Sequence, residues 1–298
     1  MEKIVECIPN FSEGRETANI ERIAGAFRNK KELKLLDYSA DRDHNRMVIT
    51  AMGSPGAIKE AIIEAVGFAL DSIDLNQHQG GHPRIGAADV IPFVPIRGMS
   101  NADCVALSKD CAAALADKYD LPIFLYEHSA TAPHRRNLAD LRKGGFEGLT
   151  EKMQDQGWAP DFGPRHPHPT GGASVVGARD PLIAYNVNLN SSRIEIAQAI
   201  ARKIRHIGGG LRCCKAIGVE LKEQGIVQVS TNITDYRKTS IYQVLELVRI
   251  EAARYGVSIA GSEIIGLLPL AALVDTTAYY LGIEKLPEQQ ILERHLME

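Results

Sequence analysis

The order of apolar segments repeats once along the chain, and this repeat limits the possible folds more than any other feature of the sequence. Alternating apolar residues predict strands, and apolar residues spaced three or four apart predict helices. In the first half, strands are expected at residues 4–9, 33–37, 47–51 and 90–95, with helices at 16–27 and 57–73. A helix at 102–118 and a strand at 122–126 extend this βαββαβ unit.

The second half runs through the same order again. Strands are expected at residues 182–189, 216–221, 227–233 and 257–261, and helices at 194–205, 240–255 and 267–281. The repeat predicts an α+β protein of two βαββαβ units, with a first domain at residues 1–180 and a second at 181–298. A single core stops growing at roughly 250–300 residues, so we expect two lobes packed around a cleft.

Charge and composition exclude several classes of partner. The formal net charge is −3, so no overall basic field attracts nucleic acid. No apolar run reaches the roughly 18 residues of a membrane span, and no secretory signal pattern is found, so neither membrane insertion nor export is expected. The five cysteines form no C-x-x-C pair, which favours a reducing cytoplasm and cysteines that serve packing.

Residues 158–172 are rich in proline and glycine and cannot continue a helix or a strand. This segment is predicted to be the linker between the two units. Binding groups commonly sit on loops that a rigid scaffold holds, and Arg165, His166 and His168 are unusual for a passive connection. The linker is therefore expected to contact a ligand in the cleft.

The densest chemical signal is the loop at residues 77–89, where His82 lies between a glycine pair and the sequence Pro83-Arg84. Glycine allows close approach to a ligand, and proline stiffens the segment. A histidine held there can accept and return a proton near neutral pH. Two alternatives remain: a zinc site with His78, although the intervening Gly-Gly disfavours a helix, and histidines that only hydrogen-bond a turn.

A second cluster, residues 41–46, lies between two strands that predict a β-hairpin. Taken alone, a charged hairpin tip is most often solvated surface. Asn45 and Arg46 begin the second strand, however, where a side chain can enter a cleft and an arginine can bind a carboxylate.

A third cluster lies at residues 262–269, where Glu263 is expected at a strand-to-helix junction, either to cap the helix or to bind a ligand. Phosphate-loop, dinucleotide and nucleophile-elbow motifs do not occur in the sequence. Phosphoryl transfer and ordinary acyl-enzyme chemistry therefore lose support.

Five segments in this order resemble the glutamate formiminotransferase family. They are VECIPNFSEG (5–14), NR (45–46), GHPRIGAADV (81–90), WAPDFGP (158–164) and IAYNVNL (183–189). The resemblance spans nearly the whole chain. It implies two ferredoxin-like subdomains meeting in a cleft, within a homodimer, and transfer of a formimino group from formiminoglutamate to tetrahydrofolate in histidine breakdown.

The resemblance also implies roles for particular residues. His82 is the expected acid–base catalyst, and no metal is required. Substrate-binding candidates are Asn10, Asn45, Arg46 and Arg84. The stretch expected to contact folate is Gly163, Pro164, Arg165, His166, Pro167, His168, Pro169, Thr170, Gly171 and Gly172.

Three departures from the family pattern bear on mechanism, folate contacts and partners, and one of them is Gly171, which stands where the animal pattern has an aromatic residue. Animal relatives carry an aspartate near the position of Ser39, whereas the nearest carboxylates here are Asp37, Asp41 and Asp43. Animal relatives also continue into a cyclodeaminase domain, so a cyclodeaminase on a separate chain is expected. The alternatives are a formyltransferase that uses N-formylglutamate or formyltetrahydrofolate, a noncatalytic folate-binding protein, and a zinc hydrolase.

Overall fold

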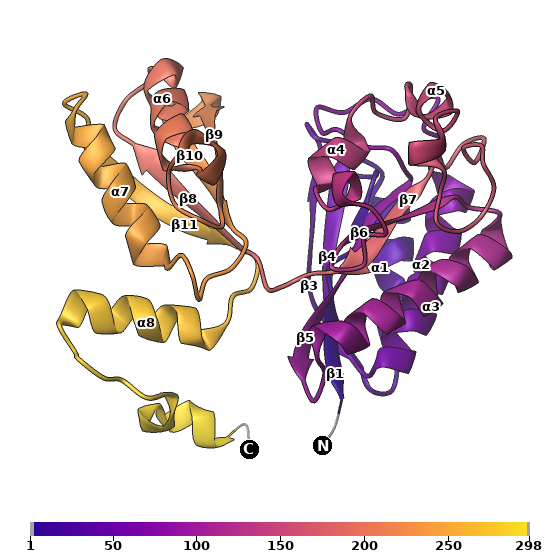
Figure 1. Cartoon of the computed structure of the whole chain (residues 1–298), viewed down its shortest axis with the longest axis horizontal. Coiled ribbons are helices and arrows are strands. Elements are labelled where there is room, and N and C mark those ends of the chain that lie inside the picture. Colours follow the sequence, from indigo (N-terminus) through magenta and orange to yellow (C-terminus); the bar gives the residue numbers. More distant parts are fainter. Residues whose placement is uncertain (1–2, 297–298) are drawn as a thin grey trace. The chain divides into compact units, whose positions relative to one another are not determined.

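The computed structural model describes residues 3–296 and separates into two compact units, Met1–Arg179 and Asp180–Glu298. Each unit has its own sheet and its own hydrophobic core (Figure 1). In the described part of the chain, no helix is both long enough and apolar enough to cross a membrane.

The first unit is built on a seven-stranded sheet, counted over the residues that are described. Its strands are β1 (Ile4–Cys7), β2 (Asn10–Phe11), β3 (Leu33–Asp41), β4 (Arg46–Gly53), β5 (Ala88–Arg97), β6 (Ile123–Glu127) and β7 (Ser174–Ala178). Its helices are α1 (Thr17–Gly25), α2 (Pro55–Ser72), α3 (Asn101–Tyr119), α4 (Leu138–Arg142) and α5 (Leu149–Lys152).

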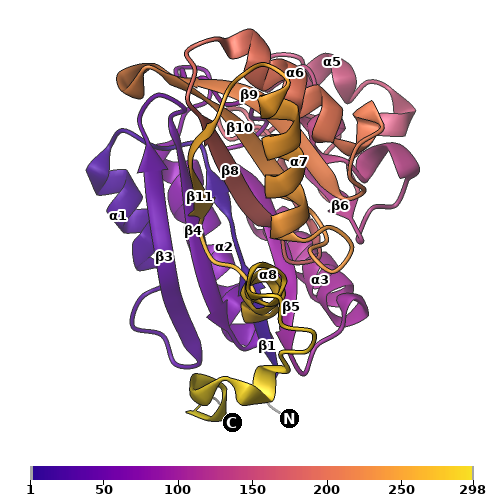
Figure 2. The same cartoon turned by 90° about the vertical axis from the view of Figure 1, so that its left-hand side faces the viewer.

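The strand order confirms a ferredoxin-like unit. β1 and β2 act as one interrupted strand, because both pair antiparallel with β4 and with β5. Together with β3, which pairs with β4 at the edge, they give the order expected of a βαββαβ unit (Figure 2). β7 then adds to β5 in parallel, and β6 adds to β7.

Both faces of the extended part of this sheet are covered. Successive strand residues point to opposite faces. Ile123 and Leu125 of β6 therefore join the core under α1–α3, whereas Phe124 and Tyr126 join a second cluster with residues of α4 and α5. The short helices α4 and α5 thus pack on the face opposite the three long helices.

Local sequence signals explain where the long helices begin. Ser54 caps α2 by accepting a hydrogen bond from the amide of Ala57, and Pro55 occupies the first helical position. Ser100 and Asp103 form a capping box at the start of α3. Cys104 and Cys111 of α3 are buried in the core, as expected for packing residues.

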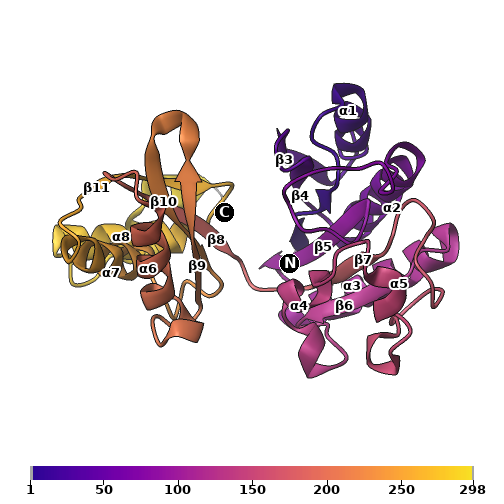
Figure 3. The same ribbon diagram turned by 90° about the horizontal axis from the view of Figure 1, so that it is seen from above.

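The second unit repeats the ferredoxin-like order on a four-stranded antiparallel sheet, again counted over the described residues. Its elements are β8 (Ile183–Leu189), α6 (Ile194–Ile204), β9 (Cys214–Leu221), β10 (Ile226–Ile233), α7 (Ile241–Ala253), β11 (Ile259–Ile265) and α8 (Leu270–Leu281). The helices α6 and α7 cover one face of this sheet (Figure 3).

The prediction that residues 158–172 form the linker between the units was wrong. Ile123 donates its amide to the carbonyl of Phe162 at 2.9 Å, and β7, which follows the segment, lies inside the sheet of the first unit. Asp161 forms a buried ion pair with Arg135 at 2.8 Å and also accepts the amide of Leu125. The segment is therefore an integral loop of the first unit, whose boundary falls later, after Arg179.

The predicted position of Glu263 at a helix start was also wrong. β11 runs to Ile265, so Glu263 lies within a strand, and α8 begins only at Leu270. The Glu263 carboxylate accepts hydrogen bonds from the side-chain amides of Asn186 and Gln228, at 3.1 and 2.9 Å. It therefore organises polar side chains on the sheet and does not cap a helix.

Candidate active site

Strand alternation places Asn10 and Arg46 on the sheet face opposite α1–α3. Their neighbours Phe11 and Met47 are buried in the core under those helices, so Asn10 and Arg46 point the other way. Asn10 is in register with Val48, two residues from Arg46 on the adjacent strand. Two of the predicted substrate-binding residues therefore share one face.

The side chain of Arg46 donates a hydrogen bond to His82. Nη1 of Arg46 lies 2.7 Å from Nε2 of His82. A guanidinium can only donate, so Nε2 accepts with its lone pair and the proton of the neutral ring is on Nδ1. The hairpin cluster and the glycine-rich loop, which are 36 residues apart, thus meet at this contact. For the half-buried Arg46, the solvated-surface interpretation of the hairpin tip is wrong.

His82 lies among positive charges. Burial lowers the pKa of His82 to about 3, with further contributions from the charges of Arg46, Arg142 and His44. The ring is therefore neutral at pH 7, which is the form that can accept a proton. None of Asp37, Asp41 and Asp43 hydrogen-bonds the ring, and Asp41 instead pairs with His44 at 3.0 Å.

Arg142 of α4 brings a second guanidinium to this site. Its Nε lies 2.8 Å from a carboxylate oxygen of Asp89, and the Asp89 side chain is only 3% exposed. The other oxygen of Asp89 accepts the amide of Ile85, which fixes the carboxylate. Burial, followed by the charge of Arg142, lowers the pKa of Arg46. Asp89 thus pairs with Arg142, whereas Arg46 has no carboxylate within salt-bridge distance among the described residues, and this excess of positive charge favours an anion.

Main-chain contacts hold the loop of His82 against the hairpin tip. The amide of Gly81 donates to the carbonyl of Asp43 at 3.1 Å. The Asn45 side chain accepts from the amide of Gly14 and donates to the carbonyl of Gln79. A Cβ atom at Gly80 would lie 2.3 Å from the carbonyl oxygen of His44, so only glycine allows this approach. Asn45 therefore positions the loop, with its side-chain oxygen and nitrogen both bonded to backbone.

His78 connects the hairpin tip to Arg84. Its Nε2 donates to the carbonyl of Asn45 at 2.9 Å, and its Nδ1 accepts from Nε of Arg84 at 3.0 Å. Both ring nitrogens are therefore used within the chain, which removes the basis for a zinc site at His78 and His82. Arg84 in turn pairs with Glu147 at 2.9 Å.

The end of the predicted folate stretch lies beside the loop of His82. The amide of Leu75 donates to the carbonyl of Thr170, and the amide of Ala87 donates to that of Gly171, both at 2.9 Å. Gly172 has a φ of +67°, and a Cβ there would lie 2.1 Å from the carbonyl oxygen of Ile85. Glycine is required at this position, because it alone combines the left-handed backbone with this approach.

His168 is fixed by the tight turn that follows it. Its amide donates to the carbonyl of Gly172, and its Nδ1 accepts the amide of Gly171 at 2.9 Å. Burial lowers the pKa of His168, so the ring is neutral at pH 7 and carries its proton on Nε2. The turn therefore sets both the tautomer and the direction of this histidine.

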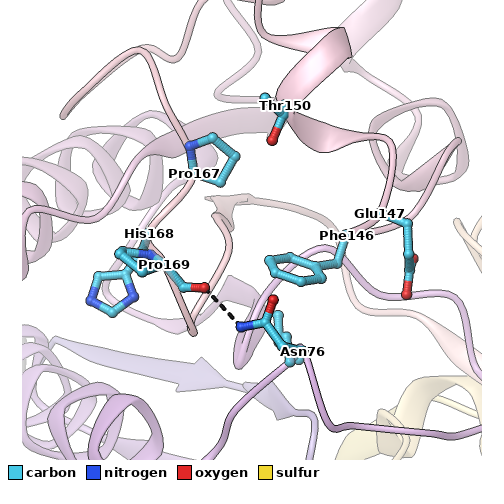
Figure 4. Close-up of a pocket in the computed structure, with 8 residues that line it drawn as sticks. Asn76, Phe146, Glu147, Thr150, Pro167, His168 and Pro169 are labelled. Carbon is cyan, nitrogen blue, oxygen red and sulfur yellow. Dashed lines mark hydrogen bonds between the residues drawn. The ribbon is translucent and has the colours of Figure 1, made fainter.

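A pocket of about 450 Å³ opens between this turn and the segment around α5 (Figure 4). It is lined by Leu75, Asn76, Phe146, Glu147, Thr150, Pro167, His168 and Pro169. The Asn76 side chain closes one wall by donating to the carbonyl of Pro169 at 3.0 Å. Three residues of the predicted folate stretch line the pocket, and Glu147 links it to the loop of His82 through Arg84 and His78.

The beginning of the predicted folate stretch does not line this pocket. Arg165 and His166 are exposed. Gly163 lies next to Leu121, at the opposite end of the stretch from the turn that follows His168, and does not line the pocket. Sequence reasoning also missed Phe146, Glu147, Thr150 and Arg142. A signal was available, because Leu138 and Leu141, and Leu149 and Met153, have helical spacing and mark α4 and α5.

Comparison with known proteins gives a consistent result over the whole chain. Residues 4–179 match the model of the N-terminal subdomain of the formiminotransferase domain, and residues 184–296 match the formiminotransferase domain model. The chain is 50% identical to a glutamate formimidoyltransferase from Streptococcus pyogenes, with complete coverage of both chains. It is 45% identical to a glutamate formimidoyltransferase from Thermoplasma acidophilum, covering 98% of this chain and 97% of the relative. It is 41% identical to a mouse formimidoyltransferase-cyclodeaminase, covering 96% of this chain and 54% of that protein.

Proposed function

The chain belongs to the formiminotransferase family, and we infer that it is a transferase that moves the formimino group of N-formimino-L-glutamate to tetrahydrofolate. The products are 5-formiminotetrahydrofolate and L-glutamate. The observation that carries this conclusion is the 50% identity to a glutamate formimidoyltransferase over all 298 residues.

We assign the proton transfers to His82. A bond forms between N5 of tetrahydrofolate and the formimino carbon, whose C=N electron pair moves to nitrogen to give a tetrahedral adduct. His82 accepts the proton that N5 loses and returns one to the nitrogen of glutamate. The bond between that nitrogen and carbon then breaks as the electron pair on the imino nitrogen re-forms the C=N bond, and glutamate leaves as the free amine. The support for this role is that the ring is half-buried and neutral at pH 7, beside two guanidiniums that favour an anionic donor.

The carboxylates of the donor are assigned to the positive side of the site. Arg46 presents a guanidinium with no carboxylate of its own within salt-bridge distance in the described chain. Arg84 is already paired with Glu147, so it lies at the edge of the donor site. Asn10 shares the sheet face of Arg46, while Asn45 positions the loop of His82. A bidentate contact to Arg46 orients the formimino carbon for attack.

The pterin ring of tetrahydrofolate is assigned to the 450 Å³ pocket, because this volume lies within the range of about 300–1,000 Å³ that small-molecule sites occupy. Phe146 offers an aromatic face to the ring. Glu147 offers carboxylate oxygens that match the N–H donors along the amino-pyrimidinone edge of a pterin. His168 and the prolines around it complete the wall.

Filling this pocket is expected to weaken folate binding selectively. The variant Thr150→Trp places an indole in the cavity, where it competes with the pterin ring for space. The KM for tetrahydrofolate should rise by more than about tenfold, which corresponds to a loss of about 1.4 kcal/mol of binding free energy. The KM for the donor should change little. The matched control is Glu151→Trp, since Glu151 is exposed on the same helix and does not line the pocket. Equal effects of the two variants on folate would remove the pocket assignment.

A formyl donor is the nearest alternative, because N-formylglutamate differs from the formimino compound only in a carbonyl in place of an imine. Parallel turnover assays with both donors and tetrahydrofolate separate the two reactions. We expect turnover with the formimino donor and little with the formyl donor. Tight folate binding without transfer from either donor would instead identify a noncatalytic folate-binding protein.

Location and assembly belong to the same proposal. We place the enzyme in the cytoplasm, where free thiols persist, because all five cysteines are free. A cyclodeaminase partner is supported by the relatives whose names join the two activities, and a place in histidine breakdown stays a prediction. The homodimer expected from the family resemblance stays a prediction.

A further inference from the structure

We propose that Arg46 is a positioning residue that occupies Nε2 of His82 in the free protein and releases it when a carboxylate of the donor binds the guanidinium. This inference rests on the proposed transferase activity. It adds to that activity a coupling between donor binding and the availability of the catalytic base.

The geometry of the contact is the first observation. A histidine that acts as a base through Nε2 needs a free lone pair there, yet Nη1 of Arg46 lies 2.7 Å from this atom and donates to it. The ring carries its proton on Nδ1, so its single lone pair is already in use. The free protein therefore holds the base in the correct neutral form but in a blocked state.

The distribution of charge is the second observation. Arg142 is anchored by the buried carboxylate of Asp89, whereas Arg46, among the described residues, donates to an uncharged imidazole. A carboxylate offers a charge-assisted and bidentate partner, which is roughly twice as strong as a neutral one. Arg46 is thus the guanidinium that gains most by turning to an anionic ligand.

The charged groups around His82 determine whether a bound carboxylate raises or lowers the pKa of the ring. Arg46 on β4, Arg142 on α4 and His44 at the hairpin tip all act against a positive charge on the ring. Asp89 on β5 is already engaged with Arg142. A ligand carboxylate at Arg46 neutralises the closest of these charges and frees Nε2, so donor binding makes the base stronger and accessible together.

The experiment follows the ring of His82 by NMR in the intact protein. Protein labelled with ¹³C-histidine is titrated with acid, and the His82 signal is assigned by its loss in the His82→Asn variant. We expect a pKa near the value of about 3 in the free protein. Saturating L-glutamate, the product that carries both carboxylates, should raise it by about 1–3 units, the usual effect of an opposite charge nearby. Sodium chloride at equal ionic strength should not.

Variants separate a switching role from a structural one. Arg46→Met removes charge and donor at similar length, so the His82 pKa should already be raised in the free protein and should no longer respond to glutamate. Arg46→Lys keeps the charge and should recover part of the response. Arg15→Met is the matched control, because Arg15 is an exposed arginine near the same hairpin that donates to the carbonyl of Arg42. It should behave like the wild type.

Turnover distinguishes failure of this inference from failure of the proposed function. Loss of one charge-assisted contact should lower kcat/KM for the donor in Arg46→Met by about 10- to 100-fold. A wild-type protein that transfers the formimino group while its His82 pKa ignores glutamate would overturn the switch alone. A wild-type protein without transfer would overturn the function on which the switch rests.

Discussion

The substitution His82→Asn is expected to lower kcat by about 10²- to 10⁴-fold, which is the usual contribution of a positioned acid–base group. Asparagine retains a polar side chain that can contact Arg46 but cannot carry a proton between two nitrogens. The loop should stay in place, because backbone contacts from Gly81 and the side chain of Asn45 hold it. The measurement is steady-state turnover of the formimino donor with tetrahydrofolate.

A nearby histidine provides the control for this variant. His44 is exposed, pairs with Asp41, and has its ring centroid 6.3 Å from that of His82. His44→Asn should therefore stay within a few-fold of wild-type turnover. Full activity in a folded His82→Asn protein would show that another group transfers the proton.

The largest expected effect on stability comes from Asp161→Ala. Asp161 and its partner Arg135 have side chains that are 9% and 7% exposed, so the variant leaves a buried cation without its carboxylate. Breaking such a pair by removing one partner costs about 3–5 kcal/mol. The amide of Leu125 and the hydroxyl of Thr131 also lose their acceptor. Urea unfolding followed by tryptophan fluorescence measures the loss in the first unit, since Trp158 is the sole tryptophan of the sequence and lies in that unit.

An exposed ion pair of the same unit is the matched control. Arg22 and Asp71 are 3.0 Å apart, with side chains that are 47% and 64% exposed. Asp71→Ala should change the free energy of unfolding by less than about 1 kcal/mol, because water already solvates both charges. If the two aspartate variants lowered stability equally, burial of the Asp161 pair would not be the cause.

The duplicated pattern of apolar segments was sufficient to predict the two βαββαβ units, because each strand and helix repeats a strong local signal. It was not sufficient for β7. This strand has only five residues and follows a stretch rich in proline and glycine, which led to the wrong prediction of a linker. Its parallel position between β5 and β6 depends on contacts between residues far apart in the sequence.

In the candidate site, too, individual residues could be predicted from the sequence, whereas their contacts with distant residues could not. His82 and Arg46 were both singled out from local sequence, but their contact depends on a glycine that lets two loops touch. The spacing of Leu138 and Leu141 marks α4, but this five-residue helix does not reveal which residue Arg142 at its end contacts, so Arg142 was missed. Its importance follows from the buried carboxylate of Asp89, which lies 53 residues earlier.

The contact between the β3–β4 turn and the loop of His82 also guides protein engineering. The turn is exposed at residues 41–44, so by exposure alone it would be chosen for an affinity tag or a fluorescent label. An insertion there would displace the carbonyls of Asp43 and Asn45 that hold the loop. The β9–β10 connection is the safer place, because a Cβ atom at Gly225 would meet nothing within 4 Å.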